Sequence, residues 1–308
     1  MENEKNIRAY GAWIAVCIIW GTTYLAIRIG VKDLPPALFA GLRWLIAGPI
    51  LMLILWSRGY KLPRKKDLAH LAVVGIFLLG IGNGLVVFSE QFLPSGLTAL
   101  LITTVPFWIV AIESFMPHGT RMNLFTAGGI LAGFLGIILI YGNDWSSLLK
   151  TENLEGIIGL MLAVIGWSIG SVYSKYKKVD VHPLMGAAVE MVIAGIVLLL
   201  AALFLGEFSN FNFTPDGFYA FVYLIIIGSL LGYASYIYAI AHLPVSFVST
   251  YAYINPIIAL FLGWIILNET ISMNIILATL IILAGVMMVK KGSGSTKLNS
   301  ISINKKEK

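Results

Sequence analysis

The stretch SFVSTYAYINPIIALFLGWIILNET, at residues 246–270, is apolar enough and long enough to cross a lipid bilayer. Its middle nevertheless carries Tyr251, Tyr253 and Asn255, and Pro256 follows directly. A helix that only anchors a chain in lipid has no use for these residues, because hydrogen-bonding groups and helix breakers are costly in hydrocarbon. The stretch therefore predicts a membrane helix that borders a space enclosed by protein.

Composition places the whole chain in a membrane. Of its 308 residues, 58% are hydrophobic and 12% are charged, and a soluble domain carries about twice that charged fraction. Apolar runs of roughly 20 residues are predicted to be helices, because a backbone in lipid must bond to itself. We therefore expect an all-α membrane protein with ten transmembrane helices. The predicted spans cover residues 10–29, 36–56, 68–90, 95–116, 123–141, 156–174, 183–205, 218–240, 244–267 and 273–289.

The basic residues predict the orientation of these helices. With the amino terminus inside, 17 of the 21 lysines and arginines fall in inner segments or in the tail, whereas the outer loops hold only Lys32 and Lys150. Cytoplasmic loops are enriched in positive charge, so both termini are predicted to be cytoplasmic. The net charge of +6 forms no basic stripe with exposed aromatics, which argues against a nucleic-acid partner.

The chain also repeats itself. At an offset of 147 residues, Trp20 falls on Trp167. The two halves, residues 1–145 and 153–290, each hold five predicted spans, and this odd number turns the second half upside down relative to the first. Inverted repeats are typical of secondary transporters, whose substrate site lies near the membrane midplane between the halves. The remaining residues, 291–308, are expected to form a flexible basic cytoplasmic tail.

The opening stretch has a counterpart in the first half, PSGLTALLITTVPFWIV at residues 94–110. Each copy begins with a proline and has a second proline twelve residues later, Pro106 in the first half and Pro256 in the second. A proline in a helix interior frees a carbonyl and bends the helix. We expect the two bent helices to face each other across a substrate cavity and the paired bends to belong to the transport mechanism.

Three motifs carry a resemblance to a known family. They are WGTTYLAIRIGVKDLPPALFAGLRWLIAG, PSGLTALLITTVP and YAYINPIIALFLGWIILNET, at residues 20–48, 94–106 and 251–270. They resemble the drug/metabolite transporter superfamily, specifically its EamA-type ten-helix members, and the first and third motifs look closest to the YedA-like exporters of that family. The resemblance covers nearly the whole chain. It implies an inner-membrane secondary transporter, usually an exporter of small metabolites, with a central cavity lined by spans 1, 3, 4, 6, 8 and 9.

We expect the substrate site to be built from aromatic and polar side chains at mid-span depth. An aromatic cavity suits flat apolar or cationic solutes through area burial and cation–π contact. For any single aromatic the alternative is packing or contact with lipid, and Asn83 is equally suited to bond a neighbouring helix. The predicted substrate-binding residues are Trp20, Tyr24, Asn83, Thr103, Trp108, Trp167, Tyr233, Tyr253 and Asn255.

Charged groups within spans are costly and often functional. Glu90 is predicted to be either a coupling site for a cation or proton or an acid that solvent reaches at the outer interface. Glu113, near the inner end of its span, is expected in a salt bridge or gate. Arg43 and Glu190 coincide at the 147-residue offset. We expect each of them to hold its own half together more than to bind substrate.

The leading interpretation is a secondary transporter that exports amino acids, amines or drug-like aromatic compounds by alternating access. A flippase for lipids or lipid-linked solutes is an alternative. A membrane-embedded enzyme is disfavoured because the four histidines are scattered along the chain.

The sequence predicts few partners beyond the solute and the bilayer. No cofactor or metal is expected, since the single cysteine, Cys17, can form neither a disulfide within the chain nor a cysteine metal cluster. The expected partners are a small-molecule substrate and the lipid bilayer, with coupling to a proton gradient as an option and the oligomeric state left open.

Overall fold

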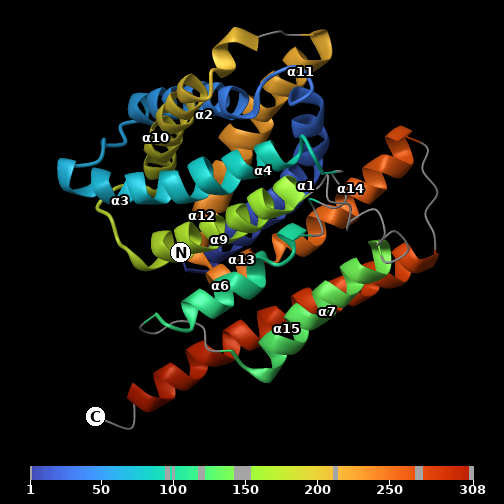
Figure 1. Ribbon diagram of the computed structural model, residues 1–308. Coiled ribbons are helices and arrows are strands. Elements are labelled where there is room, and N and C mark those ends of the chain that lie inside the picture. The colour runs from blue at the N-terminus through green and yellow to red at the C-terminus, as the bar shows by residue number, and fades with distance from the viewer. Residues whose placement is uncertain are drawn as a thin grey trace.

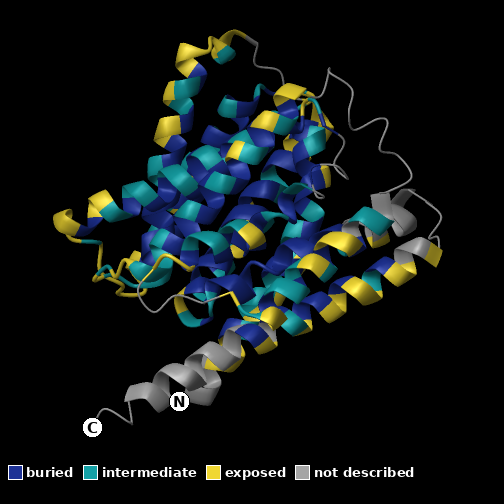
Figure 2. Cartoon of the chain, turned by 60° about the horizontal axis from the view of Figure 1, so that its bottom comes forward, coloured by how far each residue is buried: buried dark blue, intermediate teal, exposed yellow. Residues whose placement is uncertain are grey.

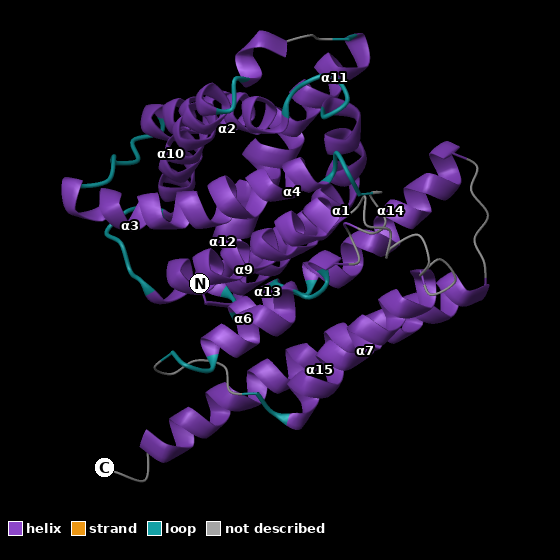
Figure 3. Ribbon diagram, in the orientation of Figure 1, coloured by secondary structure: helices purple, strands orange, loops and turns teal. Residues whose placement is uncertain are grey.

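The computed structural model is helical, and no strand occurs in the part of the chain that it describes (Figure 3). The described residues are 2–93, 98, 101–116, 122–141, 154–210, 214–267 and 273–304. Six helical segments are long and apolar enough to cross a membrane, which agrees with the predicted all-α membrane class. These segments are Asn6–Gly30, Pro36–Ser57, Lys65–Ser89, Leu154–Tyr176, Pro183–Phe204 and Pro215–His242.

The order of elements along the chain is shown in Figure 1. The first half holds α1 (Glu2–Gly30), α2 (Pro36–Ser57), α3 (Lys65–Gly75), η1 (Ile76–Asn83), α4 (Gly84–Ser89), α6 (Val105–Glu113) and α7 (Leu124–Tyr141). The second half holds α9 (Leu154–Tyr176), α10 (Pro183–Phe204), η3 (Glu207–Asn210), α11 (Pro215–Tyr223), η4 (Leu224–Tyr233), α12 (Ala234–His242), α13 (Val245–Val248), α14 (Tyr251–Leu267) and α15 (Met273–Asn304). The boundary between the two predicted domains, between residues 145 and 153, lies outside the described residues.

The prolines of the two bent spans differ in position. Pro256 lies inside α14, as predicted. The expectation of an interior proline is wrong for Pro106, which is the second residue of α6. A proline there costs no hydrogen bond, because the first N–H groups of a helix have no partner within it.

The interruption of each span instead coincides with hydroxyl side chains that bond back to the preceding turn. Thr104 Oγ1 donates to the Leu101 carbonyl at 2.7 Å, and Thr250 Oγ1 donates to the Phe247 carbonyl at 2.6 Å. Both backbone N–H groups bond three residues back, as in a tight turn. Such local bonds compete with the helical pattern. The breaks therefore lie before α6 and before α14, at Thr103–Thr104 and Ser249–Thr250.

The helix α15 extends into the predicted tail. A flexible tail is expected from residue 291, and α15 continues to Asn304, so the flexibility of this segment stays a prediction. No proline interrupts this segment, and Asn123 Nδ2 donates to the Gly292 carbonyl at 3.0 Å, which ties this part of α15 to the start of α7.

Helices α2 and α10 pack through paired small residues (Figure 1). A side chain added at Gly48 would collide with Val192, and one added at Gly195 would collide with Leu45. Glycines at such positions let two helix backbones approach closely. Higher numbers on one helix meet lower numbers on the other, so the helices run antiparallel. Both pairs of equivalent positions are separated by the same 147 residues.

Helices α7 and α15 repeat this arrangement and lie side by side in Figure 1. Gly129 lies against Val289, and Gly285 lies against Gly133. Position 285 is 156 residues after position 129, and position 289 is 156 residues after position 133. Replacing each residue by its equivalent therefore turns one of these contacts into the other. Each of these antiparallel helix pairs thus contains a local two-fold relationship.

Two π-helical segments, η1 and η4, lie in the middle of the long helices α3–α4 and α11–α12. Extra-wide helical turns of this kind are rare and often mark functional positions. Each segment carries a glycine against a tryptophan of the other half, Gly82 against Trp167 and Gly232 against Trp20. The two segments therefore position the tryptophans at the centre of the molecule.

Burial follows the pattern of a protein surrounded by lipid (Figure 2). Buried residues fill the middle of the helix bundle. Large apolar side chains such as Leu53, Leu203 and Leu280 remain exposed on the outer faces of α2, α10 and α15. In water such faces would be unfavourable, whereas lipid tails cover them without cost.

Candidate functional site

A cavity of about 70 Å³ lies at the centre of the bundle. Its wall draws on each of the six spans from which a lining was expected, and on α2 in addition. The lining residues are Trp20, Thr23, Tyr24, Ile27, Arg43, Trp44, Gly82, Asn83, Val86, Ile102, Val105, Ala163, Val164, Trp167, Gly228 and Tyr251. Four of the nine predicted substrate-binding residues, Trp20, Tyr24, Asn83 and Trp167, are therefore brought together there.

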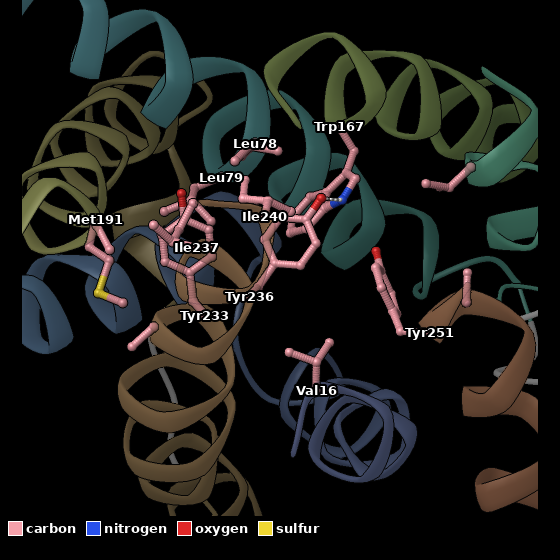
Figure 4. Close-up of a cluster of buried hydrophobic side chains, with 14 of the residues drawn as sticks. Val16, Leu78, Leu79, Trp167, Met191, Tyr233, Tyr236, Ile237, Ile240 and Tyr251 are labelled. Carbon is pink, nitrogen blue, oxygen red and sulfur yellow. Dashed lines mark hydrogen bonds between the residues drawn. The ribbon is translucent and has the colours of Figure 1, made fainter. Parts of the chain in front are cut away.

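An aromatic cluster borders this cavity, and three of its rings, Trp167, Tyr236 and Tyr251, are labelled in Figure 4. The rings of Trp20 and Trp167 meet edge to face with centroids 5.3 Å apart. Tyr236 and Tyr251 complete the cluster, with centroids 5.2 Å and 5.0 Å from that of Trp20. Because Trp20 and Trp167 are equivalent positions of the two halves, their contact lies where the halves meet.

Hydrogen bonds satisfy the polar ends of these rings. Trp167 Nε1 donates to the Tyr236 hydroxyl at 3.1 Å, drawn as a dashed line in Figure 4. Ser171 Oγ and the Tyr236 hydroxyl are 2.6 Å apart, and Trp20 Nε1 donates to the Gly228 carbonyl at 3.3 Å. The rings are thus held in fixed orientations, which leaves the aromatic surfaces of Trp20 and Trp167 for contact with a solute.

A second wall is polar and centres on Asn83. Its Oδ1 accepts hydrogen bonds from Arg43 Nη2 at 2.9 Å and from Trp44 Nε1 at 3.2 Å. The Arg43 guanidinium carbon lies 4.1 Å from the centroid of the Trp44 ring. Asn83 therefore bonds a neighbouring helix, which is one of the two roles left open by the sequence, and it also lines the cavity. Its contact with substrate stays a prediction.

Glu190 and Tyr233 form a buried pair next to this wall. The Tyr233 hydroxyl donates to Glu190 Oε2 at 2.6 Å, and the Tyr233 ring meets the Trp44 ring edge to face at 5.7 Å. Arg43 and Glu190 form no ion pair in the described part of the chain. They are linked only indirectly, through Trp44 and Tyr233. Tyr233 thus lies behind the cavity wall, and its predicted contact with substrate stays a prediction.

Three other predicted binding residues, Tyr253, Thr103 and Trp108, are not among the residues that line the cavity. Tyr253 is buried and packs its ring on Gly133 of α7, and Thr103 is buried in the turn before α6. Trp108 packs edge to face on Phe107, with ring centroids 5.5 Å apart.

Asn255 joins α14 to α1. With its amide nitrogen turned toward α1, it donates to the Cys17 carbonyl at 2.9 Å and to the Tyr251 carbonyl at 3.0 Å. This contact holds the start of α14, and with it Tyr251, beside the cavity.

Glu90 lies at the end of α4 and has no exposed surface. Its two carboxylate oxygens accept no hydrogen bond from the described residues. Its backbone carbonyl accepts one from Arg28. Solvent therefore does not reach this acid in the conformation described, and a role in ion or proton coupling stays a prediction.

Glu113 joins the ends of two helices. The Tyr176 hydroxyl at the end of α9 donates to Glu113 Oε1 at the end of α6, at 2.7 Å. This bond is the kind of contact that a gate requires, since it must break for α6 and α9 to separate.

Within the described part of the chain, no three histidine, cysteine, aspartate or glutamate side chains gather as a metal site would require. The cavity can therefore bind a solute through aromatic surface, hydrogen bonds and one cation.

Two aromatic residues, Trp44 and Tyr251, are among the lining residues outside the predicted substrate-binding set. The sequence did contain a signal for Tyr251, since it is one of the three polar residues at the middle of its span. No comparable signal marks Trp44, because a tryptophan in an apolar run is more often a packing or interface residue.

Comparisons with known proteins bear on both halves of the chain. Residues 8–142 and residues 154–290 each match the model of the EamA-like transporter family. The chain is 36% identical over 299 residues to the uncharacterized inner membrane transporter YedA of Escherichia coli strain K12, covering 95% of this chain and 94% of that protein. It is 28% identical to the uncharacterized transporter YoaV of Bacillus subtilis strain 168, covering 89% and 94% of the two chains.

A solved crystal structure shares the fold. It superposes with a TM-score of 0.75 at 20% sequence identity, covering 92% of this chain and 98% of the other. At this identity the likeness extends to the fold alone.

Proposed function

Because this chain belongs to the EamA-like transporter family, we propose that it exports small organic metabolites by alternating access through its central cavity. The family and the apolar helices make it a multi-pass transmembrane transporter.

The proposed architecture is ten transmembrane helices arranged as two inverted five-helix repeats. The two family matches support it, because they divide the chain at the same place as the sequence repeat. The two-fold related contacts between α2 and α10 and between α7 and α15 also support it, since equivalent helices run antiparallel. We further propose that both termini are cytoplasmic and that the protein lies in the inner membrane, as the name of the relative YedA states for that protein.

One observation carries the transport mechanism, namely the position of the cavity at the contact of Trp20 with Trp167. These two residues are equivalent under the repeat, so the solute site would lie where the halves rock against each other. A site at this place can be reached from either side without being moved through the protein.

Energy for export would come from an ion or solute gradient. Glu90 is the acid that we propose for proton coupling, because it is buried next to Arg28 of the last turn of α1 and its carboxylate accepts no hydrogen bond from the described residues. An acid in such a place changes its protonation when the surroundings open to water.

Reconstitution in proteoliposomes tests the proposal. Vesicles that contain the purified protein would be loaded with a mixture of amino acids, short carboxylates, amines and aromatic cations, and release would be followed by mass spectrometry. We expect at least one class of solute to leave faster than from protein-free vesicles. The change Trp20→Ala should abolish that release in a protein that still folds. Equal release with and without protein for every class would reject the transport function.

A further inference from the structure

Arg43 is a buried cation in the cavity wall. Its side chain is 3% exposed, and it is the charged member of the lining set; the other lining residues in the described part of the chain are aromatic, aliphatic, glycine, threonine or asparagine. No carboxylate of the described residues forms an ion pair with it. A buried charge in a membrane protein is normally paired, because its desolvation is otherwise unfavourable.

The groups that do touch Arg43 are neutral. Asn83 accepts one hydrogen bond from Nη2, and the Trp44 ring lies against the guanidinium. Arg43 Nε has no hydrogen-bond partner in the described part of the chain. Asn83 and Trp44 therefore fix the orientation of the guanidinium and leave its charge unbalanced and part of its donor capacity unused.

Glu190, a buried carboxylate behind the Trp44 side of this wall, is engaged elsewhere. Glu190 accepts the hydroxyl proton of Tyr233, whose ring stands between Glu190 and the Arg43–Trp44 pair. Arg43 lines the cavity, whereas Glu190 is not among its lining residues. The arrangement is that of a receptor for an anion.

We propose that the transported solute carries a carboxylate that pairs with Arg43 while its apolar body lies against Trp20 and Trp167. This inference rests on the proposed transport function and gives it a substrate class. Guanidinium is the cation best matched to a carboxylate, because it offers several N–H donors in one plane. The aromatic wall and the absence of an acid among the described lining residues select a small apolar monocarboxylate over an amine.

The size of the cavity limits the solute. A water molecule needs about 10–15 Å³ of comparable volume, so a cavity of about 70 Å³ holds a solute of only a few non-hydrogen atoms. Short branched carboxylates and the smallest apolar amino acids fall in this range. Larger members of the class require the cavity to widen during the transport cycle.

Binding to the purified full-length protein tests this assignment. The probes are isobutyrate, its neutral isostere isobutyramide and isobutylamine, with alanine to separate amino acids from simple carboxylic acids. Intrinsic fluorescence reports binding because three tryptophans line the cavity. We expect isobutyrate to bind at least tenfold more tightly than isobutyramide or isobutylamine, the effect of one charge-assisted hydrogen-bonded pair.

Variants assign the effect to Arg43. Arg43→Gln should lower the affinity for isobutyrate at least tenfold, to that of the amide, and Arg43→Lys should retain part of the preference. Arg64→Gln is the matched control, since it removes the same charge from a side chain that is 66% exposed. Its affinity for isobutyrate should equal that of the wild type.

The outcomes separate this inference from the transport function. Binding of isobutyramide or isobutylamine as tightly as isobutyrate, or no binding of isobutyrate and alanine, overturns the carboxylate assignment. So does an Arg43→Gln protein that folds and keeps the preference. If Arg43→Gln does not fold, the wild-type preference and Arg43→Lys decide. Release of amines or cations alone from proteoliposomes would leave the transporter standing and reject only the carboxylate.

Discussion

Arg28 at the end of α1 and Lys175 at the end of α9 make the same contact in the two halves of the chain. Arg28 Nη1 donates to the backbone carbonyls of Glu90 and Leu93. Lys175 Nζ donates to those of Ile240 and Leu243, at 2.7 and 2.8 Å. The two cations are 147 residues apart, which is the offset of the sequence repeat at Trp20 and Trp167. The carbonyls that they bond are 150 residues apart, which is the spacing between Pro106 and Pro256.

The contact has a clear physical basis. The last carbonyls of a helix lack intrahelical partners and carry partial negative charge, so a cation stabilises them. In each half the cation ties the end of the first span to the end of the third. Arginine and lysine both serve here, because the acceptors are single carbonyl oxygens and no planar two-pronged geometry is required.

Removing either cation should weaken its half. We expect Arg28→Gln and Lys175→Gln each to lower the free energy of unfolding by about 1–2 kcal/mol, somewhat below the value for a fully buried bond to a charged donor because both side chains are only part-buried. Thermal unfolding in detergent measures the loss. Lys177→Gln, at an exposed position near the same helix end, is the control and should leave stability unchanged. Equal stability of Lys175→Gln and Lys177→Gln would show that the contact contributes nothing.

The position of the helices could be predicted from sequence, because long apolar runs in lipid allow little besides a helix. The places where spans break could not. The sequence predicts that Pro106 and Pro256 interrupt the two spans. The turns instead come at Thr104 and Thr250, whose hydroxyls bond the preceding turn. Threonine is common in continuous membrane helices, so its presence alone does not reveal a break.

The candidate site was predictable in part for a related reason. Side chains two positions apart on an α-helix point about 200° away from each other around the helix axis. Tyr251 and Tyr253 therefore cannot both face the cavity. Tyr251 lines it, and Tyr253 packs on Gly133. Which of the two faces inward depends on the rotation of α14, and that rotation is set by the turn before it. The sequence predicts a structural role for Arg43, because span 2, which carries it, is not among the spans expected to line the cavity.

Close packing of α2 on α10 should depend on two equivalent glycines. An added methyl group at Gly48 or Gly195 would collide with the facing helix. We expect Gly48→Ala and Gly195→Ala each to cost about 1–3 kcal/mol of stability, the usual effect of overpacking. Gly11→Ala is the control, because a methyl group there meets nothing within 4 Å. Denaturant titration in detergent would show this control to be neutral or slightly stabilised, and equal effects at all three positions would contradict the packing argument.

The bond between Tyr176 and Glu113 should restrict access to the cavity. Tyr176→Phe deletes the hydroxyl while keeping the ring. If the lost bond contributes about 1 kcal/mol, the open population rises about fivefold. The rate at which a membrane-impermeant thiol reagent labels Ile102→Cys, in a Cys17→Ser background, measures this population from each side. Tyr60→Phe is the control at a more exposed site, and equal labelling rates in both variants would remove Tyr176 from the gate.

The two prolines should differ in their effect on transport, although they are equivalent in sequence. Pro256 lies inside α14, where it removes a hydrogen bond to the carbonyl of Ala252 and costs roughly 3 kcal/mol or more unless neighbours accommodate it. Pro256→Ala restores that bond and straightens the helix that carries Tyr251. The change should therefore bias the protein toward one facing of the cavity while leaving its insertion in the membrane intact. Pro106 is the second residue of α6, where its missing N–H has no helical partner to lose, so Pro106→Ala should leave the balance of facings unchanged.

Thiol labelling of Ile102→Cys from each side of the membrane, together with release from proteoliposomes, measures both variants in the Cys17→Ser background. A shift in Pro256→Ala alone is expected. Wild-type labelling and release in both variants would mean that the bend at Pro256 serves packing only. A matched shift in both would mean that the chain before Val105 acts as one helix with α6 during transport, and that Pro106 is then an interior residue.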